Sequence, residues 1–157
     1  MINLRATIKE LENLIHTIGE TLTPIIQSEA GCGKTSLLKG IEKKYGDKYD
    51  YIYVDCPVKD MSDIAMTIPN HDNKTLDTYT GSLFKLDSDR PKVILLDEFM
   101  KSPKLCQIIY TRMMLERCVG DIPLPKGSIV FGTSNNQADG LGDTMLAHAG
   151  NRVCLVE

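Results

Sequence analysis

The segment from Ser28 to Thr35, SEAGCGKT, constrains this chain more than any other part of its sequence. It follows the phosphate-loop pattern GxxxxGK[ST], except that Ser28 stands where the pattern has its first glycine. A short apolar segment at 24–27 precedes it, and a helical apolar pattern follows at Leu37, Leu38, Ile41 and Tyr45. The order strand, loop, helix predicts a phosphate-binding site, because the second half of the loop is intact.

Each residue type in this loop has a physical role in holding phosphate. Gly31 and Gly33 let the backbone approach the ligand closely, and the N–H groups up to Thr35 form a cradle at a helix N-terminus. Lys34 adds a charge toward the β- and γ-phosphates, and Thr35 offers a hydroxyl to Mg²⁺. The predicted nucleotide-binding residues are Glu29, Ala30, Gly31, Cys32, Gly33, Lys34, Thr35 and Ser36.

A second motif is the run VILLDE at 93–98, four apolar residues that lead into two carboxylates. A strand of this kind beside the phosphate-loop strand would place Asp97 over the magnesium, where it can hold a metal-bound water. Glu98 could then act as the general base for the attacking water. We therefore predict Thr35 and Asp97 as metal residues and Glu98 as catalytic.

The rest of the chain alternates predicted strands and helices. Further strands are expected at 51–54, 92–96, 128–133 and 153–156; helices are expected before Gly19, at 60–66, from Ser102-Pro103 to about 117 and at 143–149. Residues 68–90 are expected to form a loop with one short element near Leu83 and Phe84, and residues 121–127 a second loop. This order predicts an α/β fold with an open, mostly parallel five-stranded sheet flanked by helices, with its ligand at the carboxyl ends of the strands.

Composition excludes several classes of protein. The 157 residues suit a single domain, no apolar run is long enough to span a membrane, and the net charge of −3 gives no basic field for unspecific nucleic-acid binding. The five cysteines have no CxxC spacing, which argues against a disulfide framework. We expect a cytoplasmic protein with no membrane partner.

The motifs together resemble an AAA+ ATPase of the MoxR-like or dynein-related branch found in bacteria and their phages. The resemblance extends from about residue 20 and rests on SEAGCGKT, VILLDE and the run LERCVGDIPLPKGSIVFGTSNN through to NRV. It implies Mg²⁺-dependent ATP hydrolysis. It makes Asn135 the sensor residue near the γ-phosphate, with Asn136 adjacent, and Arg152 an arginine finger for a neighbouring subunit.

Within the resemblance, Arg112 and Arg117 are weaker candidates for subunit contacts and are expected to be solvated or paired helix residues. The chain stops at Glu157, before the small helical lid that the family carries. The expected unit at 1–157 is therefore one AAA+ core without its lid.

AAA+ machines of this type form rings, usually hexamers, that remodel a protein or nucleic-acid client. We expect a homo-oligomeric ring if the lid is supplied. Two alternatives stay open: a nucleotide-dependent assembly module with little turnover, and a replication-associated loader ATPase that handles DNA.

Overall fold

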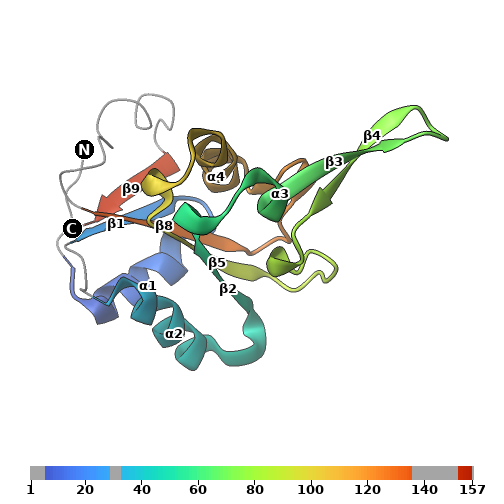
Figure 1. The fold of residues 1–157 in the computed structure, drawn as a ribbon. Coiled ribbons are helices and arrows are strands. Elements are labelled where there is room, and N and C mark those ends of the chain that lie inside the picture. Colours follow the sequence, from blue (N-terminus) through green and yellow to red (C-terminus); the bar gives the residue numbers. More distant parts are fainter. Residues whose placement is uncertain (1–5, 29–32, 136–151, 157) are drawn as a thin grey trace.

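A five-stranded sheet forms the centre of the molecule, which we describe from a computed structural model covering residues 6–28, 33–135 and 152–156. The strands lie in the order β2-β5-β8-β1-β9, and each neighbouring pair is parallel (Figure 1). Their bounds are β1 Thr23–Ser28, β2 Asp50–Asp55, β5 Lys92–Asp97, β8 Ile129–Asn135 and β9 Val153–Val156. The predicted parallel α/β fold is confirmed.

Helices cover both faces of this sheet. Helices α1 (Ile8–Ile18) and α2 (Lys34–Tyr45) lie on one face, and α4 (Lys104–Glu116) lies on the other (Figure 1). The alternation along β5 shows why its sequence is continuously apolar: Val93 and Leu95 pack in the cluster with α1 and α2, whereas 94 and 96 pack in the cluster with α4.

The predicted first helix is present, and its start has a clear chemical cause. The Thr7 hydroxyl accepts from the Glu10 backbone N–H, and the Glu10 carboxylate accepts from the Thr7 N–H, so the two residues form a capping box. Leu11 and Ile15 are buried against the sheet. Gly19 ends the helix, as its position predicted.

The prediction for 68–90 is wrong over the part that forms a β-hairpin, whereas the short element expected near Leu83 and Phe84 is present as a 3₁₀ turn. Strands β3 (Ala65–Asn70) and β4 (Thr75–Thr80) pair antiparallel and project from the body of the molecule (Figure 1). The helix expected at 60–66 is only α3 (Met61–Ile64), and short 3₁₀ turns follow β2 and β4 at Cys56–Val58 and Ser82–Phe84. The hairpin escaped prediction because its polar threonines and asparagines resemble a loop.

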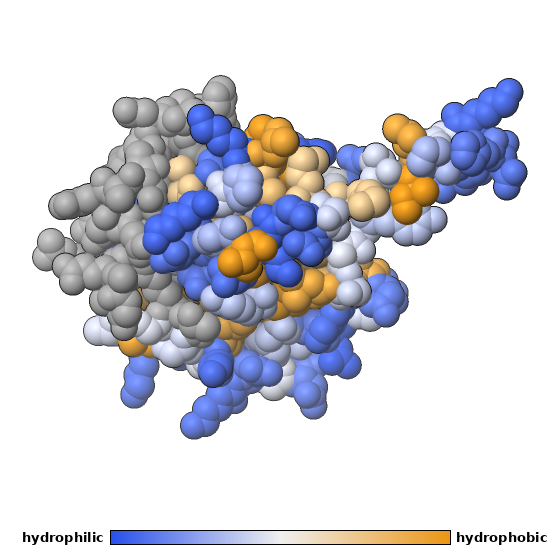
Figure 2. Space-filling model, viewed as in Figure 1, coloured by the Kyte–Doolittle hydropathy of each residue, from blue (hydrophilic) through white to orange (hydrophobic). Residues whose placement is uncertain are grey.

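The hairpin exposes several large apolar side chains: Met66, Ile68, Leu76 and Tyr79. In the space-filling view apolar colour lies along the projection and hydrophilic residues occupy its end (Figure 2). The hairpin is therefore a surface feature that contributes little to the central core.

Two further boundaries differ from expectation. Residues 121–127 are not all loop, since β6 (Cys118–Val119) and β7 (Ile122–Pro123) form a small hairpin whose turn places Gly120 at φ 59°. Helix α4 starts at Lys104 with Pro103 as its N-cap, because the Ser102 hydroxyl instead donates to the Phe99 carbonyl at 2.5 Å and closes the 3₁₀ turn Phe99–Lys101. The helix expected at 143–149 lies outside the described residues.

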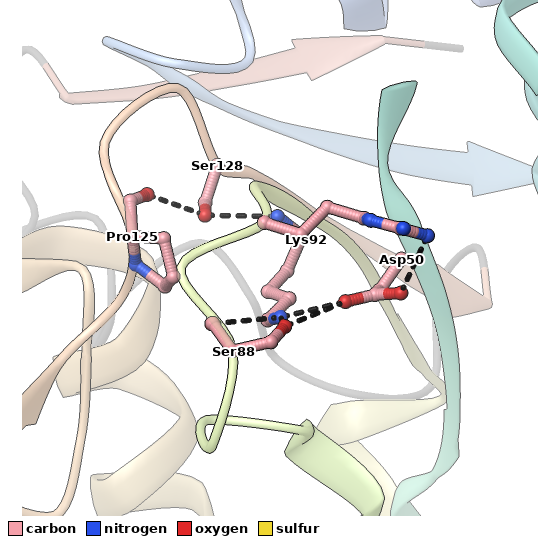
Figure 3. A network of polar contacts seen from close by, with 6 residues as sticks. Asp50, Ser88, Lys92, Pro125 and Ser128 are labelled. Carbon is pink, nitrogen blue, oxygen red and sulfur yellow. Dashed lines mark hydrogen bonds and ion pairs between the residues drawn. The ribbon is translucent and has the colours of Figure 1, made fainter. Parts of the chain in front are cut away.

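A polar network, here called the amino-end cluster, joins the amino ends of the strands and consists of Asp50, Ser88, Arg90, Lys92 and Ser128 (Figure 3). Lys92 is completely buried; its ammonium lies 2.7 Å from the Asp50 carboxylate and donates to the Ser88 hydroxyl at 2.8 Å. The hydrogen bond from Lys92 is the main reason why the pKa of Asp50 is lowered. The cluster ties the loop before β5 to β2.

Among the described cysteines, Cys56, Cys106, Cys118 and Cys154 are free thiols. No helix in the described ranges is both long and apolar enough to cross a membrane. A 3₁₀ turn at Gly46–Lys48 links α2 to β2.

Candidate functional site

The carboxyl ends of β1, β5 and β8 lie along one edge of the sheet, because these strands are parallel. Strand β1 ends at Ser28, where the predicted phosphate loop begins, and α2 starts at Lys34. Glu29, Ala30, Gly31 and Cys32 and the side chains of Lys34 and Thr35 lie outside the described part of the chain. The strand before the predicted loop and the helix after it, which the motif requires, are therefore both present.

The start of α2 has the backbone that a phosphate loop needs at its end. Gly33 caps the helix at φ 78°, a left-handed conformation that favours glycine. Ser36 is exposed, and its N–H and hydroxyl both donate to the Gly33 carbonyl, at 2.9 and 2.5 Å. Ser36 therefore supports the turn at the start of the helix with both its N–H and its hydroxyl.

The strand order corrects one sequence-based expectation. The acidic strand β5 does not neighbour the phosphate-loop strand, because β8 lies between them and β2 lies on the far side of β5. Ser28 of β1 is level with Asn135 of β8, and Leu96 of β5 is level with Gly132. Asp97 and Glu98 thus belong to a strand that is separated from β1 by one strand, and the residues of β8 lie between them and the phosphate loop.

The Asp97 carboxylate is held by hydroxyls from both neighbouring strands. Tyr53 of β2 donates to its Oδ2 at 2.8 Å, and Thr133 of β8 donates to its Oδ1. Leu95 and Phe131, two residues earlier on their strands, pack in the cluster with α2, so Asp97 and Thr133 lie on that same face. The carboxylate is therefore on the face of the sheet from which the phosphate-loop helix starts.

Glu98 follows directly in a left-handed conformation, with φ 48° and ψ 37°. Its backbone N–H donates to the Thr133 hydroxyl at 3.0 Å, and its carboxylate lies 2.9 Å from the Lys101 ammonium. Positive φ in a glutamate is uncommon, and such conformations cluster at functional sites. The turn directs the Glu98 side chain along a different path from that of Asp97.

Sequence reasoning missed Tyr53 and Thr133. Only the register of the strands could have indicated that these two residues lie near Asp97. Tyr53 is level with Leu95, and Thr133 stands two residues before the predicted sensor Asn135. Asn135 ends β8 and is level with Ser28, and its role as the sensor residue stays a prediction. Its side chain and all of Asn136 lie outside the described residues.

The three arginines that the sequence analysis singled out have different surroundings. Arg152 is exposed and donates to the Leu115 carbonyl at 3.2 Å. Arg112 pairs with Glu116 at 3.1 Å, as expected of a helix residue. Arg117 is partly buried: burial lowers its pKa to about 10, and it donates to the backbone carbonyls of 19 and 22, in the turn between α1 and β1.

The donors at this edge fit Mg²⁺. Magnesium prefers oxygen ligands and keeps several of its waters, so it needs few protein groups. Each Asp97 oxygen takes one hydrogen bond from the described hydroxyls, which leaves lone pairs on both for a metal or its waters. No group of three or more His, Cys, Asp or Glu side chains gathers in the described part of the chain, so a closed metal cage of that kind is not seen there.

Comparisons with known proteins agree with this architecture. The chain is similar to the solved structure of a proposed ATPase from Cytophaga hutchinsonii, with a TM-score of 0.52 and 22% identity. The similarity covers 83% of this chain and 39% of that one, so this chain spans well under half of its neighbour. At this identity the likeness shows the fold alone. No curated protein matches the sequence.

A family match goes further than the fold. The pattern that defines the viral superfamily 1 RNA helicase core domain matches residues 25–121, which is more than half of the chain. The match spans the phosphate loop, β5 and both acidic residues. Together with the fold it supports a nucleotide-binding P-loop ATPase domain, while the MoxR-like branch is named by neither comparison. The chain belongs to the viral superfamily 1 RNA helicase core domain family.

Proposed function

We propose that this chain binds ATP with Mg²⁺ at the carboxyl edge of its sheet and hydrolyses it. One observation carries the proposal: the strand order brings the start of the phosphate loop, the Asp97–Glu98 pair and the end of β8 to one edge. Phosphoryl transfer needs mainly positioning and charge stabilisation, which such an edge can supply.

Each residue then has one task. The N–H groups at the start of α2 and Lys34 bind the phosphates, while Thr35 and Asp97 hold the metal and its waters. Bound Mg²⁺ supplies charge neutralisation on the phosphate oxygens. Glu98 accepts the proton of the attacking water, and Asn135 orients that water from the end of β8.

The family match makes RNA the client that we favour. Members are described as RNA helicase cores, so we propose that hydrolysis is coupled to movement on single-stranded RNA or to its separation from a partner strand. The acidic balance of the chain, −3 overall, argues against strong unspecific binding. RNA contact would therefore depend on a local surface and would stimulate turnover more than it tightens binding.

The decisive experiment measures steady-state ATP turnover with Mg²⁺, with and without single-stranded RNA. Lys34→Ala and Glu98→Gln should lower turnover at least about 100-fold, since each removes a group that acts on the reacting phosphate. Lys39→Ala and Glu42→Gln, exposed residues on α2, are the matched controls and should leave it unchanged. Turnover that survives Glu98→Gln would contradict the role of Glu98.

A second candidate is an oligomeric, MoxR-like ATPase ring that remodels a protein or nucleic acid, and the position of Arg152 favours it. Arg152 precedes Val153, which is level with Thr23 at the first residue of β1. The phosphate loop follows the last residue of β1, roughly 17 Å away along the strand. This separation supports a role for Arg152 at the nucleotide of another subunit and not at its own.

This candidate has its own test. Turnover per chain should rise with protein concentration, and Arg152→Ala should abolish the rise while Arg112→Ala, another exposed arginine, should not. Mixing Arg152→Ala with Glu98→Gln protein should recover part of the activity if one subunit completes the site of the next. ATP binding without turnover in the wild type would favour the assembly module instead, and salt-sensitive DNA binding the loader ATPase.

A further inference from the structure

We propose that Tyr53 and Thr133 are positioning residues that hold the Asp97 carboxylate ready for its metal. The inference rests on the proposed function of Asp97 and deepens it. Tyr53 belongs to β2 and Thr133 to β8, the two strands on either side of β5. Neither residue belongs to the phosphate-loop motif or to the acidic motif.

The geometry restrains the carboxylate from both sides. The Tyr53 hydroxyl donates to Oδ2 at 2.8 Å and the Thr133 hydroxyl donates to Oδ1. Rotation of the carboxylate about its terminal bond would break both hydrogen bonds at once. Groups that orient a metal-ligating carboxylate in this way commonly change metal affinity or activity about 10- to 100-fold when removed.

Packing alone does not account for these two side chains. Tyr53 keeps 39% of its surface exposed, so its ring is only partly used by the core, and its hydroxyl ends at Asp97. Thr133 is completely buried, and its one hydroxyl donates to the Asp97 carboxylate and accepts from the Glu98 N–H. Valine would fill the same space at Thr133 without either bond.

Thr133 differs from Tyr53 in touching both acidic residues. Its oxygen accepts from the Glu98 backbone at 3.0 Å, at the residue whose φ is 48°. Loss of this hydroxyl should therefore disturb both the metal ligand and the path of the predicted base. Loss of the Tyr53 hydroxyl should disturb the metal ligand and leave the bond from Thr133 to the Glu98 backbone in place, so the two variants separate metal binding from turnover.

The experiment measures Mn²⁺ binding by electron paramagnetic resonance in the presence of ADP, which requires no turnover. Tyr53→Phe and Thr133→Val should each weaken Mn²⁺ binding about 10-fold, and Thr133→Ser, which keeps the hydroxyl, should stay within about twofold of the wild type. ADP binding in EDTA should be unchanged in all three. In a parallel ATPase assay at saturating Mg²⁺, Tyr53→Phe should recover its turnover and Thr133→Val should not.

Two matched controls come from the same sheet. Tyr51→Phe removes a hydroxyl from the same strand as Tyr53, but this hydroxyl donates to the Gly46 carbonyl, away from Asp97. Thr23→Val removes a completely buried hydroxyl from β1 that donates to the Met114 carbonyl at 2.8 Å. Neither should change Mn²⁺ binding, and circular dichroism establishes that each variant is folded.

The outcomes separate the two proposals. If the wild type binds neither ADP nor Mn²⁺ with ADP, the proposed function and this inference both fail. If the wild type binds both and Tyr53→Phe matches its Tyr51→Phe control, the inference alone is overturned. If Thr133→Val does not fold, Tyr53→Phe still decides the matter, because it retains the ring and loses only the hydroxyl.

Discussion

Strand β5 carries a charged residue at each end, and the two charged side chains have different kinds of partner. At its first residue, Lys92 is buried and paired with Asp50, which also lies 3.5 Å from Arg90. At its last residue, the hydrogen bonds that described residues make to Asp97 come from hydroxyls. The amino end balances its charge within the chain, while the carboxyl end holds a carboxylate between two hydroxyls, where we propose that a cation binds. The first arrangement suits folding, and the second suits binding.

Breaking the ion pair between Lys92 and Asp50 should have the largest effect on the free energy of unfolding. Asp50→Asn leaves the buried Lys92 ammonium without its carboxylate, so we expect a loss of about 3 kcal/mol in unfolding free energy, measured by urea denaturation. Asp47→Asn, at an exposed acidic residue nearby, is the control and should change stability by less than about 0.5 kcal/mol.

Removing both charges of the Lys92–Asp50 pair provides a second check, because it leaves no buried charge without a partner. Lys92→Met in the Asp50→Asn background removes the stranded ammonium and fills its volume with apolar atoms, so most of the lost stability should return. A loss below about 1 kcal/mol in Asp50→Asn alone would contradict the view that this end serves folding.

At the opposite end, Asp97→Asn should show the reverse pattern. The amide keeps the shape of the side chain but loses the negative charge, so ATP turnover should fall at least about 100-fold, comparable to other losses of a key electrostatic group. The free energy of unfolding should change by less than about 1 kcal/mol, since no buried charge is stranded. Equal losses of stability at Asp50 and Asp97 would remove the contrast between the two ends.

Acid should weaken the contribution of Asp50 to the stability of the fold. The pKa of Asp50 is lowered in the folded chain, chiefly by its hydrogen bond from Lys92, so this carboxyl stabilises the fold at pH values above its ordinary pKa of 3.8. That contribution is lost as pH falls below 3.8 toward the lower folded value. Urea midpoints between pH 6 and pH 3 should therefore fall more steeply in the wild type than in Asp50→Asn.

The smallest effect is expected at the exposed ion pair beside the site. Lys101 and Glu98 are 42% and 33% exposed, and surface pairs of this kind contribute little to stability. Lys101→Met should change the free energy of unfolding by less than about 0.5 kcal/mol in urea denaturation. A loss as large as that at Asp50 would mean that the carboxyl end also serves folding.

Much of this molecule could be predicted from local patterns. The apolar run of β5, the glycine-rich loop before α2 and the final strand are visible in the sequence, because the buried strands and the helix start each leave a local signature. The same patterns placed Asp97 and Glu98 at the end of a strand. The β3–β4 hairpin was missed, since exposed strands rich in threonine and asparagine look like loops.

The hydroxyls around Asp97 could not be predicted in the same way. Tyr53 is 44 residues from Asp97 and Thr133 is 36 residues from it, so their contacts depend on which strands are neighbours. The alternation of strands and helices predicts a parallel sheet but leaves the strand order open. Only with β8 between β1 and β5 do Thr133 and Tyr53 flank the carboxylate.

The same strand order has a consequence for how the chain folds during synthesis. Strand β1 pairs with β8 and β9, whose residues are made about a hundred positions after it. Until those strands emerge, β1 has no partner in the sheet, and β2 can pair only once β5 has been made. Contacts this distant in sequence form slowly and leave an apolar strand exposed in the meantime. The segment that begins the phosphate loop is thus synthesised well before the strands that fix its place in the sheet.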